Sequence, residues 1–132
     1  MLVVDASCLY EVIVDGPRAE EVSVAFASDP DLVAPHLIDV EVMGVIRKAT
    51  TERRLDSTAG RLATVSLASW PGERFGHQPL LARVWELRAN VRTQDAVYVA
   101  LAEVLGATLV TLDARMAKAP GIRCEVLVPE LG

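Results

Sequence analysis

The sequence contains few cysteines and no long apolar segment. Two cysteines, Cys8 and Cys124, among 132 residues are too few for a disulfide framework, and we expect both to serve as small apolar residues. Hydrophobic residues make up 52% of the chain, but no apolar run approaches the ~18–20 residues of a membrane-spanning helix. The first residues also lack the basic start and long apolar stretch of a signal peptide. We therefore expect a cytoplasmic protein without a membrane segment.

Basic residues are outnumbered by acidic ones, which gives a net charge of −5. Proteins that bind nucleic acid usually carry a basic surface, so this charge argues at first sight against such a function. A cluster of carboxylates that holds a divalent metal would account for much of the excess, and the metal would invert the local field that a phosphate experiences. The net charge therefore does not exclude a nucleic-acid substrate.

Short apolar runs alternate with longer helical segments along the chain, which predicts an α/β fold with a central, mostly parallel sheet of about five strands. The first run, Leu2-Val3-Val4, does not alternate, as expected for a parallel strand covered on both faces. The predicted strands cover residues 2–4, 32–34, 73–77, 108–112 and 124–127. The predicted helices cover residues 6–14, 18–27, 37–53, 57–70, 79–90, 94–105 and 114–119.

Two of the predicted strands are followed by an aspartate. Asp5 comes directly after the first strand, and Asp113 comes just after the strand that ends at Thr111-Leu112. Ligands bind outside the carboxyl ends of parallel strands, so both carboxylates should lie at the same edge of the sheet. Each aspartate precedes a helix and could instead be a helix cap. Capping alone does not explain why both positions also keep a hydroxyl nearby, at Ser7 and Thr111.

Two further acids lie on predicted helices. Asp95 is in the first turn of its helix, where a carboxylate interacts favourably with the helix dipole whether or not it has another role. Glu41 is flanked by aliphatic residues, and burying its charge is costly unless the carboxylate is paired or binds metal. Asp39 is the competing acid. Because two positions on a helix point to nearly opposite faces, we assign Glu41 to the site and Asp39 to the solvated first turn.

Three segments of the chain resemble those that carry the acids of the PIN domain family. They are VVDASCL, PHLIDVEVMGVIRK and QDAVYVALAEVLGATLVTLDARM, and the resemblance runs from Met1 to about Val128. The third segment is the most specific, because it combines an aspartate that opens a helix, a turn, and a strand ending in Thr-x-Asp. The resemblance places the family's acids at Asp5, Glu41, Asp95 and Asp113, with Ser7 and Thr111 as polar supporters.

Chain size and helix order further resemble VapC, the toxin of bacterial and archaeal toxin–antitoxin pairs. This resemblance implies a single, three-layer PIN-like domain over residues 1–132 that acts as an endoribonuclease and hydrolyses RNA phosphodiesters with water activated by Mg²⁺ or Mn²⁺. Asp5 and Asp95 would be the nearest metal ligands, with Asp113 and Glu41 binding directly or through water. The resemblance also implies a homodimer and a cognate VapB-type antitoxin as partners.

The surfaces for substrate and partners are less clearly marked. We expect Arg92 and Arg115 to bind RNA, because each lies within three residues of a predicted ligand, although a solvated helix face is the competing interpretation. Four apolar residues could serve a partner interface, and we expect most of them to lie in the core instead: Leu55, Leu62, Val65 and Trp70.

The chain departs from the family pattern at two positions. Gly44 stands where the family often has asparagine, and Gln94 stands where an aromatic residue commonly precedes the third acid. Neither change removes a predicted ligand. A phosphotransferase of the haloacid dehalogenase type would need a second aspartate where this chain has Ser7. The remaining alternative is a non-catalytic PIN-like binding module whose acids engage the basic tail of a partner.

Overall fold

A five-stranded sheet in which every pairing is parallel forms the centre of the molecule. The computed structural model describes residues 1–130, so the last two residues of the predicted domain, 131–132, lie outside the described part. The strands follow the spatial order β3-β2-β1-β4-β5. Their bounds are Leu2–Val4 (β1), Leu32–Pro35 (β2), Glu73–Phe75 (β3), Thr108–Val110 (β4) and Val126–Leu127 (β5). The predicted α/β class with a mostly parallel sheet is confirmed.

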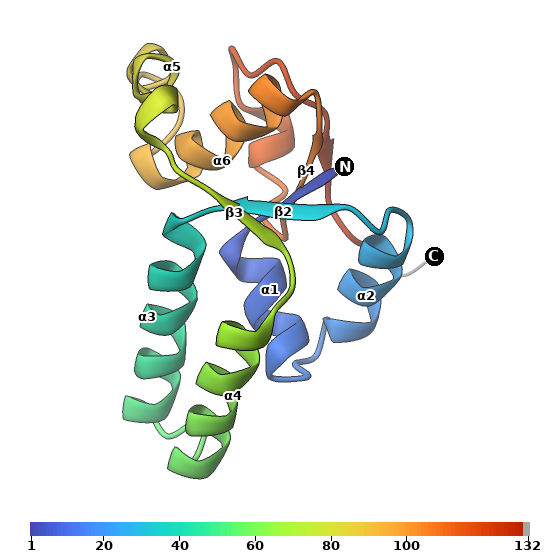
Figure 1. Cartoon of the computed structure of the whole chain (residues 1–132), viewed down its shortest axis with the longest axis vertical. Helices are drawn as coiled ribbons and strands as arrows, with labels where there is room; N and C mark the ends of the chain where they lie inside the picture. The colour runs from blue at the N-terminus through green and yellow to red at the C-terminus, as the bar shows by residue number, and fades with distance from the viewer. Residues whose placement is uncertain (131–132) are drawn as a thin grey trace.

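Helices cover both faces of this sheet and make a three-layer α/β/α arrangement (Figure 1). One side carries α1 (Ala6–Ile13), α2 (Ala19–Ala27), α3 (Leu37–Thr51) and α4 (Ser57–Ser69), and the other carries α5 (Leu81–Glu86) and α6 (Thr93–Leu105). All three residues of β1 are buried, which agrees with its unbroken apolar sequence. Within residues 1–130, no helix combines the length and apolar character that a membrane crossing requires.

Helix α6 is the central helix of its layer. It packs against β1, β2 and β4 on one side and against α5 on the other. Every residue from Ala96 to Ala102 is buried, as expected for a helix that is apolar on all sides. The helix ends where Gly106 adopts a left-handed conformation with φ of 63°, which glycine accommodates without a steric cost. This packing fixes the first turn of α6 at the carboxyl edge of the sheet.

The α3–α4 pair shows why part of the predicted core is exposed. A Cβ atom at Gly60 would lie 2.5 Å from the Thr50 Cγ2 atom, so glycine permits the close approach of the two helices. Helix α4 buries Gly60, Ala63 and Leu67 on this face. Leu62 and Val65 point elsewhere and are 54% and 53% exposed. The expectation that most of the four apolar residues lie in the core is therefore wrong for these two, while Leu55 and Trp70 are half-buried.

Several predicted elements are shorter in the structure. The helix predicted over residues 79–90 is a 3₁₀ turn, η1 (Gln78–Leu80), followed by α5, which ends at Glu86. The regular pattern of α5 stops there: the Leu87 N–H divides its hydrogen bond between the Arg83 and Val84 carbonyls, and the Arg88 N–H bonds only three residues back, to Trp85. The predicted helix 114–119 is likewise only a 3₁₀ turn, η2 (Met116–Lys118). The strands predicted over residues 73–77, 108–112 and 124–127 are also shorter in the structure, where they are β3, β4 and β5.

Arg74 connects the edge strand β3 to the α3–α4 pair. Its guanidinium donates to the carbonyls of Leu67, Trp70 and Gly72 at distances of 2.6–3.0 Å, which joins β3 to the end of α4 and to the turn that follows it. It also donates to both carboxylate oxygens of Asp39, at 2.9 and 3.3 Å. The Arg74 side chain is only 19% exposed, so these bonds are partly shielded from water.

We predict that Arg74→Ala lowers the free energy of unfolding by about 1–3 kcal/mol, because it leaves partly buried carbonyls and a carboxylate without their donor. Urea denaturation followed by circular dichroism measures this change. Arg74→Lys should not restore stability, since an ammonium group lacks the planar set of donors. Arg61→Ala, at an exposed position on α4, is the control. Equal midpoints for Arg74→Ala and Arg61→Ala would contradict this account.

Candidate active site

The acids gather where the strand order reverses. The chain passes from β1 to β2 and β3 on one side of the sheet and then returns to place β4 and β5 on the other. Such a reversal opens a crevice at the carboxyl ends of the strands. A cavity of about 400 Å³ lies there. This acid cavity is lined by Asp5, Ala6, Ser7, Glu41, Arg92, Asp95, Tyr98, Leu112, Asp113 and Arg115.

Asp5 serves both as a helix cap and as a lining residue of the acid cavity. Its Oδ1 atom accepts from the Cys8 N–H at 3.1 Å, which caps α1, and from the Ser7 hydroxyl at 2.7 Å. Its Oδ2 atom accepts from the Thr111 hydroxyl at 2.5 Å. Burial raises the pKa of the Asp5 carboxyl, and the hydrogen bonds from Thr111 and Ser7 oppose that rise. Asp5 is therefore both the helix cap and the site acid that the sequence offered as alternatives.

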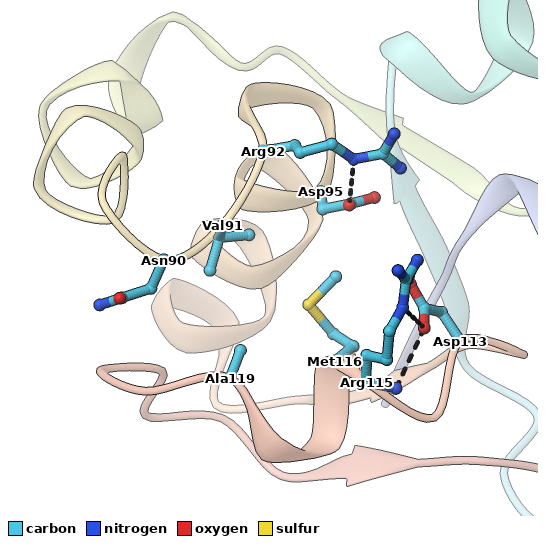
Figure 2. A pocket seen from close by; sticks show the side chains of 8 residues that line it. All are labelled: Asn90, Val91, Arg92, Asp95, Asp113, Arg115, Met116 and Ala119. Carbon is cyan, nitrogen blue, oxygen red and sulfur yellow. Dashed lines mark hydrogen bonds and ion pairs between the residues drawn. The ribbon is translucent and has the colours of Figure 1, made fainter.

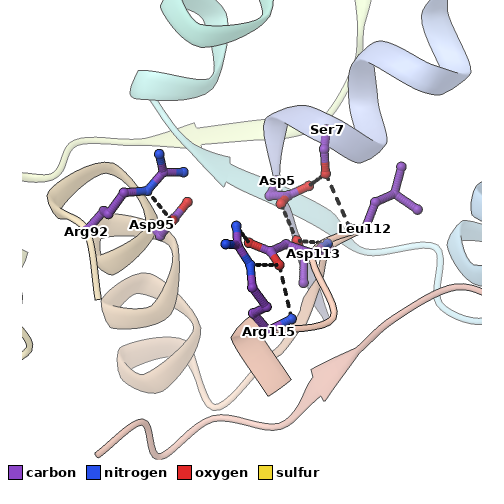
Figure 3. A network of polar contacts seen from close by, with 8 residues as sticks. Asp5, Ser7, Arg92, Asp95, Leu112, Asp113 and Arg115 are labelled. Atoms are coloured by element: carbon purple, nitrogen blue, oxygen red, sulfur yellow. Dashed lines mark hydrogen bonds and ion pairs between the residues drawn. The ribbon is translucent and has the colours of Figure 1, made fainter. Parts of the chain in front are cut away.

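Two hydroxyl groups join the end of β1 to the end of β4 (Figure 3). The Thr111 hydroxyl donates to Asp5 and accepts from the Asp113 N–H at 3.0 Å. The Ser7 hydroxyl donates to Asp5 and accepts from the Leu112 N–H at 3.3 Å. Because a hydroxyl has a single proton, each bond to a backbone N–H directs that proton toward Asp5. Ser7 and Thr111 thus fix the separation of the two acid-bearing strand ends.

Two of the acids form ion pairs with arginines close to them in sequence (Figure 3). Asp113 accepts from the Arg115 N–H at 3.0 Å and from the Arg115 guanidinium at 3.1 and 3.3 Å. These bonds lower the pKa of the Asp113 carboxyl. Asp95 accepts from Arg92 Nε at 3.2 Å. The Arg92 and Arg115 side chains are 78% and 87% exposed, so both pairs lie at the open side of the cavity.

Glu41 reaches the acid cavity from α3 and is held there by Tyr98. The Tyr98 hydroxyl, which belongs to a side chain buried in α6, donates to Glu41 Oε1 at 2.6 Å. Burial raises the pKa of Glu41, the bond from Tyr98 opposes the rise, and the charges of Asp95 and Asp5 add to it. Asp39 instead pairs with Arg74 outside the cavity.

Tyr98 is the polar lining residue that the sequence prediction missed. A buried tyrosine in an apolar helix is usually a core residue, and nothing in the composition of α6 distinguishes it. Its position three residues after Asp95 was the available signal, because residues three apart on a helix lie on the same face.

The donor chemistry of the acid cavity suits a hard divalent cation. Carboxylate and hydroxyl oxygens are the ligands that Mg²⁺ and Mn²⁺ prefer. In the arrangement observed over residues 1–130, no three His, Cys, Asp or Glu side chains are close enough together to form a ligand group. The Asp95 and Asp113 carboxylates are turned toward their arginines, and Asp5 toward the two hydroxyls.

The two departures from the family pattern leave this lining unchanged. Gly44 is exposed one turn beyond Glu41, and a Cβ atom there would meet no atom within 4 Å. Gln94 is exposed beside Asp95. Neither residue lines the acid cavity.

An α/β/α domain with four carboxylates at the reversal point of a parallel sheet defines the class of this protein. The family model described as PIN domain matches residues 2–122. The chain belongs to the PIN domain family, which confirms the resemblance seen in the sequence.

Sequence and structure comparisons identify relatives over nearly the whole chain. It is 35% identical over 125 residues to Ribonuclease VapC1 of Mycobacterium tuberculosis, which covers 94% of each chain. Its fold is similar to a toxin–antitoxin complex from Klebsiella pneumoniae, with a TM-score of 0.68 and 22% identity over 98% of each chain. It is also similar to Mycobacterium tuberculosis VapC20, described as a sarcin-ricin loop cleaving toxin, with a TM-score of 0.69 and 16% identity over 93% of this chain and 97% of that one.

We predict that Tyr98→Phe raises the pKa of Glu41 further, because the hydrogen bond that favours the charged carboxylate is lost. Unfolding free energy should fall by ~0.5–1.5 kcal/mol, as for loss of one partly shielded hydrogen bond. A ¹³C NMR titration of the glutamate side chains measures the pKa, and urea denaturation measures the stability.

Tyr10→Phe is the matched control, since the structure gives the Tyr10 hydroxyl no hydrogen bond to a protein group within residues 1–130 and the side chain is half-buried. A Glu41 titration curve that is identical in wild-type and Tyr98→Phe protein would show that Tyr98 does not hold this carboxylate.

Proposed function

We propose that this protein is a divalent-metal-dependent endoribonuclease that acts in the cytoplasm as the toxin of a VapBC-type pair. The observation that carries the proposal is the convergence of Asp5, Glu41, Asp95 and Asp113 on one cavity at the reversal point of the sheet. The ribonuclease name of the 35% identical relative supports the same activity, and its near-complete overlap with this chain supports a single domain of that kind.

The acid cavity would hold Mg²⁺ or Mn²⁺ through these carboxylates. When bound, the ion would supply the charge that offsets a phosphodiester and lowers the pKa of water. The residues of the chain provide the remaining functions. Ser7 and Thr111 orient Asp5, and Tyr98 orients Glu41. Asp95 is held by the packing of α6, so its carboxylate enters the cavity from a rigid element.

Arg92 and Arg115 are placed to bind the RNA backbone. Both line the acid cavity and both carry a highly exposed guanidinium. Arginine recognises phosphate through paired donors in one plane, and phosphate contacts position a nucleic acid without reading its sequence. We propose that both side chains exchange their aspartate for a phosphate when substrate and metal enter.

The partners proposed are a second copy of the chain and a VapB-type antitoxin. The toxin–antitoxin description of a structural neighbour supports the second of these. Apolar side chains exposed on α3 and α4 provide surface suited to protein partners: Val40, Met43, Leu62 and Val65. The alternative, a non-catalytic module that binds a basic tail, is less well supported because all four acids are present.

We predict that Asp5→Asn and Asp95→Asn each reduce Mn²⁺-dependent cleavage of single-stranded RNA by at least roughly a hundredfold, the upper end of what loss of an outer-shell partner causes. Both proteins should fold, since asparagine caps α1 at position 5 as well as aspartate does, and Asp95 caps no helix and has a partly exposed side chain. Gel analysis of RNA fragments measures the rate, and EDTA should stop cleavage by the wild type until Mn²⁺ is restored.

Asp39→Asn is the matched control, because this acid lies on the same helix as Glu41 but pairs with Arg74 outside the cavity. It should cleave RNA at nearly the wild-type rate, whereas Glu41→Gln should not. Undiminished cleavage by Asp95→Asn would contradict the four-acid site. Loss of activity in Asp39→Asn together with full activity in Glu41→Gln would mean that the wrong acid of α3 has been assigned.

We predict that Arg115→Ala has opposite effects on metal and RNA. Removing the guanidinium frees Asp113, so Mn²⁺ affinity should rise by only about two- to fivefold, because an exposed ion pair is weak. RNA affinity should fall because a phosphate contact is lost. Isothermal titration with Mn²⁺ and fluorescence anisotropy with labelled RNA measure the two affinities. Lys118→Ala removes the same charge from an exposed position outside the cavity and should leave Mn²⁺ affinity unchanged.

A further inference from the structure

A second hollow of about 240 Å³ adjoins the acid cavity (Figure 2). Its wall on one side is formed by the two ion pairs, Arg92 with Asp95 and Arg115 with Asp113, which also line the acid cavity. The other residues that line it are Asn90, Val91, Met116 and Ala119, none of which belongs to the acid cavity. We call this hollow the side pocket. Any group bound there would be next to a phosphate held by the arginines.

The side pocket combines an apolar floor with a polar edge. Val91 and Met116 are 6% and 7% exposed and lie on either side of the pocket, with Ala119 below them (Figure 2). Asn90 is exposed and lies at the end of the pocket farthest from the acids. An amide can both donate and accept hydrogen bonds. The pocket therefore offers a surface for a flat apolar ring and an amide for the polar rim of that ring.

We propose that the side pocket binds the base of the nucleotide next to the phosphate that is cut. This proposal rests on the ribonuclease function proposed above and adds a subsite to it. Unstacked RNA bases are bound on apolar side chains and on the planes of arginine guanidinium groups, and their edges are read by hydrogen bonds. Val91, Met116 and the two arginines provide such surfaces, and Asn90 provides the contact to the edge of the base.

The size and position of the side pocket favour one base. Its volume of about 240 Å³ is below the ~300–1,000 Å³ of pockets for drug-sized ligands, so a single heterocycle fits better than a longer segment. The arginines stand between the two cavities, so one phosphate can contact them while the attached base enters the side pocket. The protein would then select its cleavage sites through the identity of that base as well as through backbone contacts.

The test fills the side pocket while leaving the acid cavity intact. Ala119→Phe places a ring in the pocket from the residue that follows η2, and Ala117→Phe places the same ring within η2, at an exposed position outside the pocket. Single-stranded RNA of mixed sequence is cut with Mn²⁺ by each protein, and the fragment ends are sequenced. Thermal unfolding shows that each variant is folded, and isothermal titration with Mn²⁺ shows that the acid cavity still binds metal.

We expect the wild type and Ala117→Phe to prefer a particular base at one position beside the cut. Ala119→Phe should lose this preference and cleave its preferred sequence at least tenfold more slowly, with Mn²⁺ affinity unchanged. The defect should disappear on an RNA that carries an abasic residue at that position, because no base then needs the pocket. Asn90→Ala, at an exposed position that should tolerate substitution, serves as a second variant and should weaken the preference.

Two results would overturn the subsite. One is a wild-type enzyme that cuts RNA without base preference beside the cleaved bond, and the other is an unchanged preference in both Ala119→Phe and Asn90→Ala. Failure of the ribonuclease function itself gives a different result, since the wild type would then bind Mn²⁺ and cut no RNA. The outcome for the subsite is thus distinguishable from the outcome for the activity.

Discussion

The hydrogen bonds that converge on Asp5 are the constraint on which the site depends. Cys8 N–H, the Ser7 hydroxyl and the Thr111 hydroxyl all donate to this one carboxylate, and the two hydroxyls also hold backbone N–H groups that follow β4. Asp113 is therefore positioned relative to Asp5 by the same bonds that satisfy Asp5. The Asp5 carboxylate is stabilised in a buried place by hydrogen bonds from uncharged donors rather than by a neighbouring cation.

Ion pairs between aspartates and nearby arginines explain how an acidic protein can be suited to a polyanionic substrate. Asp95 and Asp113 each lie beside an arginine within three residues, so the open side of the acid cavity is nearly neutral although the chain carries a net charge of −5. The enclosed acids, Asp5 and Glu41, use hydroxyl donors in place of cations. A cation entering the cavity would have to draw the Asp95 and Asp113 carboxylates away from their arginines, and the freed guanidinium groups would remain at the rim to meet phosphate.

Much of the fold and of the candidate site could be predicted from the sequence, because the informative features lie within short segments of the chain. An apolar run followed by aspartate marks a strand end, and parallel strands bring such ends together, which located Asp5 and Asp113. The early end of α5 and the exposure of Leu62 could not be predicted, since hydrogen-bond geometry and the choice of packing face are set by tertiary contacts. Tyr98 was missed for a related reason: its bond spans 57 positions, and a core tyrosine has the same local sequence.

The link between Thr111 and Asp5 joins residues 106 positions apart, which has a consequence for synthesis. An N-terminal fragment that stops before β4 cannot contain the acid cavity, because Asp113 and both backbone donors follow that strand. Contacts between segments so distant in sequence form late, after the loop-closure entropy has been overcome. A nascent chain that has not yet reached β4 therefore cannot assemble the acid cavity, and any activity of this cavity has to wait for that strand.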